Sequence, residues 1–186
     1  MTHAYTARRI RLIWVLAVFA LVGCAAAPVD WQSRPGVSQV QGPAFDVFFE
    51  PVKGDRTFFS AFRLTVVNKT EEALAVDWNR TRYLYDGKNA GAFAFKGISP
   101  EQIKTGSVQS DIVEPGAQLT KTIAPVRLVA FAPMGAKGGG VAEKGLRAGK
   151  LPDGDNGILL VLSSSSRTFR TELVVHIEAV PGPSSS

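Results

Sequence analysis

Apolar and polar residues alternate with a period of two through most of this chain, and that pattern restricts its fold more than any other feature. In one stretch, Phe62, Leu64 and Val66 fall on one side while the residues between them fall on the other. Alternation of this kind is typical of strands with one buried face. The apolar run ILLVL, residues 158–162, indicates a strand buried on both faces. Because no segment of the body has a sustained helical period, we predict an all-β domain over residues 44–180, an antiparallel β-sandwich of about seven to nine strands.

Two short segments add a resemblance to a known family. Trp78, in the segment LAVDWN, resembles the buried tryptophan of immunoglobulin-like domains. The turn NKTEE and the later segment YLYDG are similar to bacterial envelope modules of immunoglobulin type. The resemblance implies an immunoglobulin-like β-sandwich and assigns no functional residues. The inter-sheet disulfide of antibody domains is impossible here, because Cys24 is the only cysteine in the chain.

The first 23 residues have the features of a signal peptide. Arg8, Arg9 and Arg11 precede an uncharged, largely apolar run from Leu12 to Gly23. That run is about 12 residues long, whereas a helix needs about 20 apolar residues to cross a bilayer. A basic stretch before a short apolar run is typical of a cleaved secretory signal peptide.

The end of the apolar run resembles the lipobox of bacterial lipoprotein precursors. Leu21, Val22 and Gly23 occupy the aliphatic and small positions directly before Cys24. The resemblance implies cleavage before Cys24 and attachment of a diacylglyceryl group to its sulfur, with further acylation of the new amine. Several acyl chains hold a protein stably on a membrane, whereas one does so only marginally. Ala25, in place of an aspartate, implies sorting to the outer membrane, with the protein facing the periplasm.

Removal of residues 1–23 changes the charge of the chain. The whole sequence has 21 basic and 16 acidic side chains, a net charge of +5. The removed segment contains three arginines and no acid, which leaves 18 basic and 16 acidic side chains and a net charge of +2. We therefore expect no nucleic-acid partner, because the high isoelectric point belongs partly to the leader. The membrane, reached through the lipidated cysteine, is the expected partner, together with a protein of the envelope.

The segment between the cysteine and the domain, residues 24–43, contains three prolines and has no sustained periodicity. We predict a flexible tether, which at full extension would reach about 60 Å. Trp31 stands alone in this segment. It either contacts lipid headgroups or packs on the domain, and the sequence leaves both interpretations open. The last residues, 181–186, are predicted to form a disordered tail.

One segment of the body, residues 133–157, departs from the strand pattern. It is rich in glycine and is predicted to be a long loop, with a possible helical turn between Val141 and Arg147. Loops of this length are usually functional or disordered. One interpretation is a basic loop that contacts anionic lipid, lipopolysaccharide or a partner protein, and the other is simple flexibility. The candidate contact residues are Lys137, Lys144, Arg147 and Lys150.

Motifs for catalysis, nucleotides and metals are incomplete. The segment GLRAGKL lacks the spacing of a phosphate-binding P-loop. The segment DGDNG lacks the later ligands of a calcium loop, and a turn is the preferred interpretation. His176 is the only histidine after the leader, and strand alternation places it on a polar face; no G-x-S-x-G motif accompanies it. We expect no catalytic residues, no metal and no cofactor.

These patterns together favour a non-catalytic, lipid-anchored β-sandwich that acts as an interaction or accessory module of the cell envelope. Such domains bind partners by adding a strand at a sheet edge or through their loops. Two alternatives stay open. The domain could carry a small amphiphilic ligand, or it could be a hydrolase of an unrecognised type.

Overall fold

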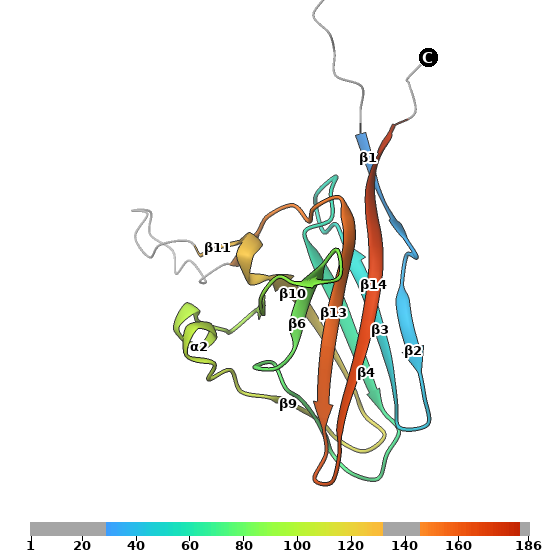
Figure 1. Ribbon diagram of the computed structural model, residues 1–186, viewed down its shortest axis with the longest axis vertical. Coiled ribbons are helices and arrows are strands. Elements are labelled where there is room, and N and C mark those ends of the chain that lie inside the picture. Colours follow the sequence, from blue (N-terminus) through green and yellow to red (C-terminus); the bar gives the residue numbers. More distant parts are fainter. Residues whose placement is uncertain (1–28, 132–145, 183–186) are drawn as a thin grey trace, which may run out of the picture. The chain divides into compact units, whose positions relative to one another are not determined.

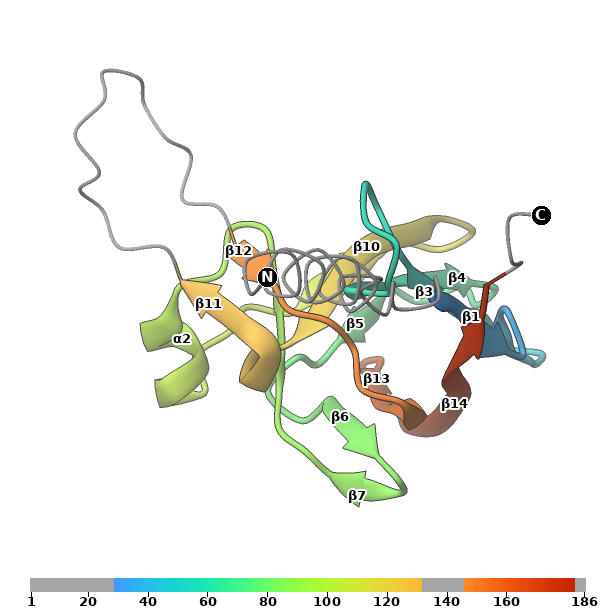
Figure 2. The ribbon, with the colours of Figure 1, turned by 90° about the horizontal axis from the view of Figure 1, so that it is seen from above.

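The computed structural model describes residues 29–131 and 146–182. Of the described residues, Asp30–Val180 form one compact unit. The compact unit is built from two antiparallel sheets that face each other, with β13 and β14 in one layer and β3, β4 and β10 in the other (Figures 1 and 2). The predicted all-β antiparallel sandwich is confirmed.

The first sheet has seven strands in the order β1-β14-β13-β5-β9, with β6 beside β13 and β7 beside β6. The second has five strands in the order β2-β3-β4-β10-β8, and β11 and β12 form a small pair of their own. The bounds in the first sheet are β1 Val29–Arg34, β5 Leu74–Val76, β6 Arg82–Tyr85, β7 Lys88–Asn89, β9 Asp111–Val113, β13 Gly154–Ser163 and β14 Thr168–Pro181. The bounds elsewhere are β2 Ser38–Gln41, β3 Phe45–Val52, β4 Ala61–Asn68, β8 Phe93–Phe95, β10 Gln118–Pro125, β11 Val129–Phe131 and β12 Leu146–Ala148.

The connections between strands follow a known sandwich order. The strands β3-β4-β10-β8 correspond to A-B-E-D, and β5-β13-β14 correspond to C-F-G, which is the arrangement of the constant-type immunoglobulin sandwich. The number of strands exceeds the predicted seven to nine. Several of the additional strands have only two to four residues, as β2, β7 and β9 do. Segments that short contain too few positions for alternation to be recognised.

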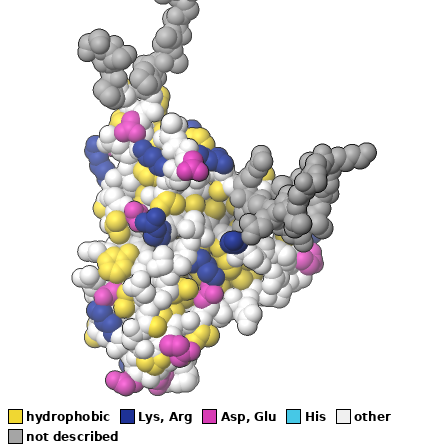
Figure 3. Space-filling view, turned by 180° about the vertical axis from the view of Figure 1, so that it is seen from behind, with side chains coloured by type: hydrophobic (Ala, Val, Ile, Leu, Met, Phe, Trp, Pro, Cys, Tyr) yellow, Lys and Arg dark blue, Asp and Glu magenta, His cyan; other side chains and the backbone are white. Residues whose placement is uncertain are grey.

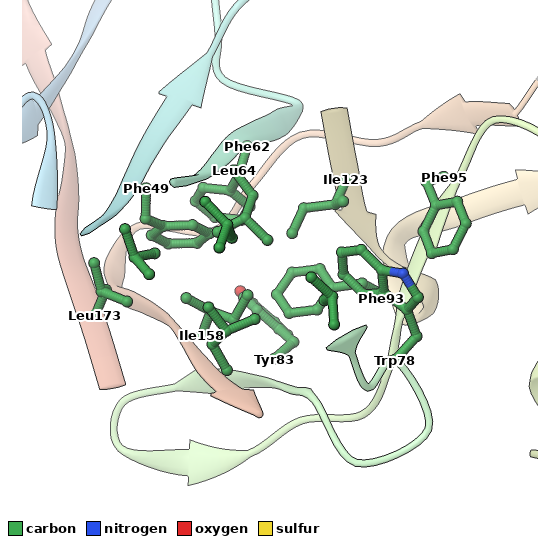
Figure 4. Close-up of a cluster of buried hydrophobic side chains, with 14 of the residues drawn as sticks. Phe49, Phe62, Leu64, Trp78, Tyr83, Phe93, Phe95, Ile123, Ile158 and Leu173 are labelled. Atoms are coloured by element: carbon green, nitrogen blue, oxygen red, sulfur yellow. The ribbon is translucent and has the colours of Figure 1, made fainter. Parts of the chain in front are cut away.

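The core lies between the two sheets and is rich in aromatic rings. Phe49 and Phe62 stack with their ring centroids 4.3 Å apart, and the rings of Tyr83 and Phe93 meet edge to face at 5.8 Å. These rings fill the centre of the sandwich (Figure 4). The predicted inward face of β4 is confirmed, because its alternating apolar side chains are fully buried. Interdigitated rings and aliphatic side chains therefore hold the sheets together without a disulfide.

The predicted tether is wrong over most of its length. Residues 29–34 and 38–41 form β1 and β2, which pair with β14 and β3 respectively. Val40 lies opposite Val47 and packs on the core, and a cis peptide bond joins Arg34 to Pro35 between the two strands. The segment adds one edge strand to each sheet, a tertiary pairing that local alternation does not reveal. Residues 24–28, the remainder of the predicted tether, lie outside the described residues.

The predicted loop at 133–157 is also shorter than expected. Residues 146–148 pair with β11, and β13 begins at Gly154, so that the segment DGDNG enters a strand instead of forming a turn. Leu151 is fully buried, and its N–H donates to the Phe59 carbonyl oxygen at 2.8 Å. Burial of this one side chain explains why the chain is ordered there. The rest of the loop, with most of the proposed helical turn, lies outside the described residues, as do residues 183–186 of the predicted tail; Pro181 itself ends β14.

One short α-helix, α2 (Pro100–Thr105), and a 3₁₀ turn (Val126–Leu128) complete the described chain. The helix begins with a capping box, in which the Ser99 side chain accepts from the Gln102 N–H and the Gln102 side chain accepts from the Ser99 N–H. It ends at Gly106, whose positive φ of 63° suits a left-handed C-cap. Six residues are too few to produce a helical period in the sequence. In the described part of the chain, no helix is long and apolar enough to span a membrane.

Candidate functional site

The structure describes only part of the predicted site. The lipid-attachment residue Cys24 and the lipobox residues Leu21, Val22 and Gly23 lie outside the described residues, as do Lys137 and Lys144. The backbone of Arg147 lies on β12 and pairs with Ala130 of β11. Lys150 is the one predicted contact residue whose side chain is described.

Lys150 lies against the tryptophan of the N-terminal strand. Its Nζ atom is 4.3 Å from the centroid of the Trp31 ring. Trp31 is partly buried and packs against the hydrophobic core. Of the two interpretations of Trp31, packing on the domain is therefore the one that the structure shows. The contact joins β1 to the segment that precedes β13, two parts of the chain that are far apart in sequence.

The loop between β3 and β4 extends this surface. The Lys53 Nζ atom lies 3.0 Å from the Asp30 carboxylate and 5.1 Å from the centroid of the Phe59 ring. The hydrogen bond from Lys53 lowers the pKa of Asp30 below its ordinary value. In the same loop the Arg56 guanidinium lies 5.3 Å from the ring centroid of Phe58. We call this surface the cation–aromatic end; it comprises Asp30, Trp31, Lys53, Arg56, Phe58, Phe59 and Lys150.

A second candidate surface lies beside α2, where strand β9 forms an edge of the first sheet. Strand β9 pairs with β5 on one side, and its Ile112 side chain is 56% exposed. A surface groove of about 410 Å³ runs along this edge, lined by the residues 95–98, Gln102 and 108–112. We call it the β9 groove. An edge strand beside an open groove can accept an extended peptide as an added strand.

A partly buried network fixes the position of the β9 groove. The Trp78 indole N–H donates to the Asp111 carboxylate at 2.7 Å, and Lys121 pairs with the same carboxylate oxygen. The Lys121 Nζ atom also lies 4.1 Å from the centroid of the Phe95 ring. The acid at the start of β9 is thus held by two donors from other elements. Trp78, predicted as the core tryptophan, is indeed buried and additionally orients the edge strand.

His176 was the only histidine available for chemistry, and it lies on the outer face of β14. Its Nδ1 atom is 2.7 Å from Asp155 Oδ1, directly across the β13–β14 pair. This hydrogen bond raises the pKa of His176 above its ordinary value. Within the described part of the chain, Asp155 is the only side chain hydrogen-bonded to the ring. The described residues include no group of three His, Cys, Asp or Glu placed to hold a metal ion.

Charged side chains of both signs are interspersed on the face that Figure 3 shows. The helix α2, which borders the β9 groove, and β1, which begins the cation–aromatic end, lie on different sides of the sandwich (Figure 2). A scan against models of protein families and a search of curated proteins found no match to this chain.

Proposed function

We propose that this chain is a lipid-anchored lipoprotein of the bacterial cell envelope and that its sandwich is a non-catalytic interaction module in the periplasm. The lipobox residues Leu21–Gly23 before Cys24 support the anchor. Ala25 supports attachment to the outer membrane. The immunoglobulin-like strand order supports a kinship with envelope modules of immunoglobulin type.

The observation that carries the interaction role is the outer edge of β9 beside its groove, which pairs with no strand of residues 29–131 and 146–182. An edge strand presents backbone N–H and C=O groups that can pair with another chain, and the exposed Ile112 offers an apolar contact beside them. Here the edge is short, and the network around Asp111 holds it in place. We propose an extended segment of an envelope protein as the occupant, paired to β9 through its backbone and contacting Ile112 through apolar side chains.

The alternatives gain less support from the geometry. A carrier of an amphiphilic ligand needs an apolar cavity, and the rings of Phe49, Phe62 and Tyr83 fill the centre of the sandwich. Lipid that copurifies with the protein, beyond the anchor itself, would favour this alternative. A hydrolase built on His176 and Asp155 needs a nucleophile beside the ring, on a face that is open to solvent.

A site-specific crosslink tests the interaction role. A photo-reactive residue at Ile112, in the membrane-tethered protein in living cells, should give one defined adduct with an envelope protein. The matched control is Val174 on β14, which is also solvent-exposed but lies in the middle of a paired strand. Equal adducts at the two positions, or none at Ile112, would contradict the proposal.

The basic loop is tested separately by a deletion. Removal of residues 134–156 would unfold the domain, because it deletes the buried residues Leu151 and Asn156. Replacement of residues 133–145 by a short Gly-Ser linker spares both. If the loop contributes to binding, this variant should stay folded and give a weaker adduct at Ile112.

A further inference from the structure

The distance between the proposed anchor and the folded unit is short. Only six residues of chain lead from Cys24 to Asp30, the first residue of the compact unit. A chain of that length spans at most about 20 Å when fully extended. If Cys24 is acylated, its Cα atom lies at the surface of the bilayer, and Asp30 must lie within that distance of it. The sandwich is therefore held close to the membrane instead of on a long tether.

The position of Asp30 decides which end of the sandwich is close. Contacts join Asp30 to Lys53, Trp31 to Lys150, and Leu151 to Phe59. These contacts place the cation–aromatic end at the start of β1. The opposite end is formed by the turn between β13 and β14 and by the end of β4. Strand β14 has 14 residues, which at about 3.3 Å per residue separates the two ends by about 45 Å.

The side chains at the near end suit a membrane surface. Lys53, Arg56 and Lys150 each lie over an aromatic ring. Aromatic rings with basic side chains are typical of the membrane–water interface, where the ring sits at headgroup level and the cation meets phosphate. Arg56 and Lys150 are exposed and form no ion pair with any described residue.

At least three acids lie at this end. Asp153, three residues after Lys150, accepts a hydrogen bond from the Ala179 N–H at 3.2 Å, at the end of β14. The Asp30 carboxylate is held by Lys53, so the charges of that pair cancel locally. Asp55 lies beside Arg56 in the sequence of the same loop. The end therefore has no excess of positive charge over these acids. Arg56 and Lys150 are the cations available to an anion, because neither forms an ion pair with a described residue.

We propose that the cation–aromatic end lies against the headgroups of the bilayer that holds Cys24, with Arg56 and Lys150 contacting the phosphates of anionic phospholipids. This inference rests on the proposed function, because the short connection holds the domain near the bilayer only if Cys24 is acylated. It fixes the orientation of the domain: the cation–aromatic end faces the lipid, and the turn between β13 and β14 points into the periplasm.

Spin labels on the acylated, full-length mature protein test the orientation. The only natural cysteine is then blocked by lipid, so a single engineered cysteine can be labelled cleanly. The matched sites are Thr57→Cys at the near end and Ser166→Cys at the far end, both exposed. The protein is reconstituted in vesicles of phosphatidylglycerol and phosphatidylcholine that contain a nickel-chelating lipid. We expect relaxation enhancement by headgroup nickel to be at least fivefold greater at residue 57 than at residue 166.

Equal enhancement at the two sites, or a larger one at residue 166, would overturn the orientation. The headgroup contact is tested by the double variant Arg56→Gln, Lys150→Gln, which should lower the enhancement at residue 57 by about twofold or more. The control is Arg167→Gln, an exposed cation in the turn between β13 and β14 at the far end. An unchanged signal in the double variant would overturn the contact. If the natural protein does not float with vesicles, the proposed anchor is wrong. If it floats but the nickel enhancement is equal at residues 57 and 166, the anchor stands and only the orientation is wrong.

Discussion

The two ends of the sandwich are built in different ways. At the far end, side chains of the turns hydrogen-bond to their own backbone, as Asn68 and Thr70 do after β4 and Ser164 does after β13. At the near end, cations lie over aromatic rings, and their N–H groups keep donor capacity for another partner. The near end has similar bonds, as Asn156 forms with the Pro152 and Gly154 carbonyl oxygens. It differs from the far end in the cations that lie over its rings, of which Arg56 and Lys150 form no ion pair with a described residue. This difference is the basis of our proposal that the near end makes the contact with the membrane.

The side chain of Asn68, at the far end, forms all of its hydrogen bonds within the protein. It is 1% exposed, and its amide nitrogen donates to the Glu72 and Val113 carbonyl oxygens at 2.7 and 2.9 Å. Its side-chain oxygen accepts from the N–H and the hydroxyl group of Thr70. One side chain therefore ties the turn after β4 to the end of β9.

The largest expected effect follows from removal of that side chain. Asn68→Ala removes the buried bond to the Val113 carbonyl oxygen and the acceptor of the Thr70 N–H and hydroxyl groups, and the free energy of unfolding should fall by about 3 kcal/mol. Urea denaturation of the soluble domain measures this loss. The nickel enhancement at residue 57 should not change, since the near end is untouched. A loss in the free energy of unfolding below about 1 kcal/mol would show that water replaces the Asn68 amide, and that its hydrogen bonds contribute less to the stability of the far end than we infer.

An intermediate effect is expected at the near end. Trp31→Ala removes a partly buried ring and should lower the free energy of unfolding by about 1 kcal/mol, about half the value of a fully buried large side chain. It should also reduce the nickel enhancement at residue 57, because Lys150 loses the ring that supports it. Trp31→Phe is the matched control and should keep most of the free energy of unfolding and most of the nickel enhancement at residue 57. If Trp31→Ala changed stability alone, the ring would have no part in the membrane contact.

The smallest effect concerns the exposed pair of His176 and Asp155. The pKa of His176 is raised in the folded state, so protonation favours folding. The contribution is fully present below the pKa of the unfolded state, about 6.5, and is lost as the pH rises through the folded-state pKa. Denaturant midpoints between pH 5 and 9 should show this small decline in the natural protein and not in Asp155→Asn. A decline of equal size in that variant would assign it to other groups.

The sequence predicted the centre of the sandwich better than its margins. The buried faces of β4 and β14 follow directly from alternation, because each strand is long and has one face in the core, whereas β13 follows from its continuous apolar run. The strands β1 and β2 were missed because they are edge strands whose stability comes from β14 and β3. Helix α2 was missed because it is too short to show a helical period in the sequence. Its ends are marked only by a capping box and a C-terminal glycine.

The candidate surfaces depend on contacts between distant segments, which limits what one sequence can predict. Lys150 was a predicted contact residue, but its support by Trp31 needs the folded chain. The β9 groove had no local signal, since Ile112 is an ordinary apolar residue until the sheet order leaves it at an edge. The resemblance to a lipobox, by contrast, depends on a contiguous motif and needs no structure to be seen.

The most direct test of the account is the mass of the N-terminus in the natural protein, extracted with detergent from bacterial membranes. We predict a chain that begins at Cys24 and bears a diacylglyceryl group on its sulfur, with a further acyl chain on its amine. A chain that keeps residues 1–23 and an unmodified thiol at Cys24 would contradict it, because neither the anchor nor the orientation of the sandwich could then be maintained.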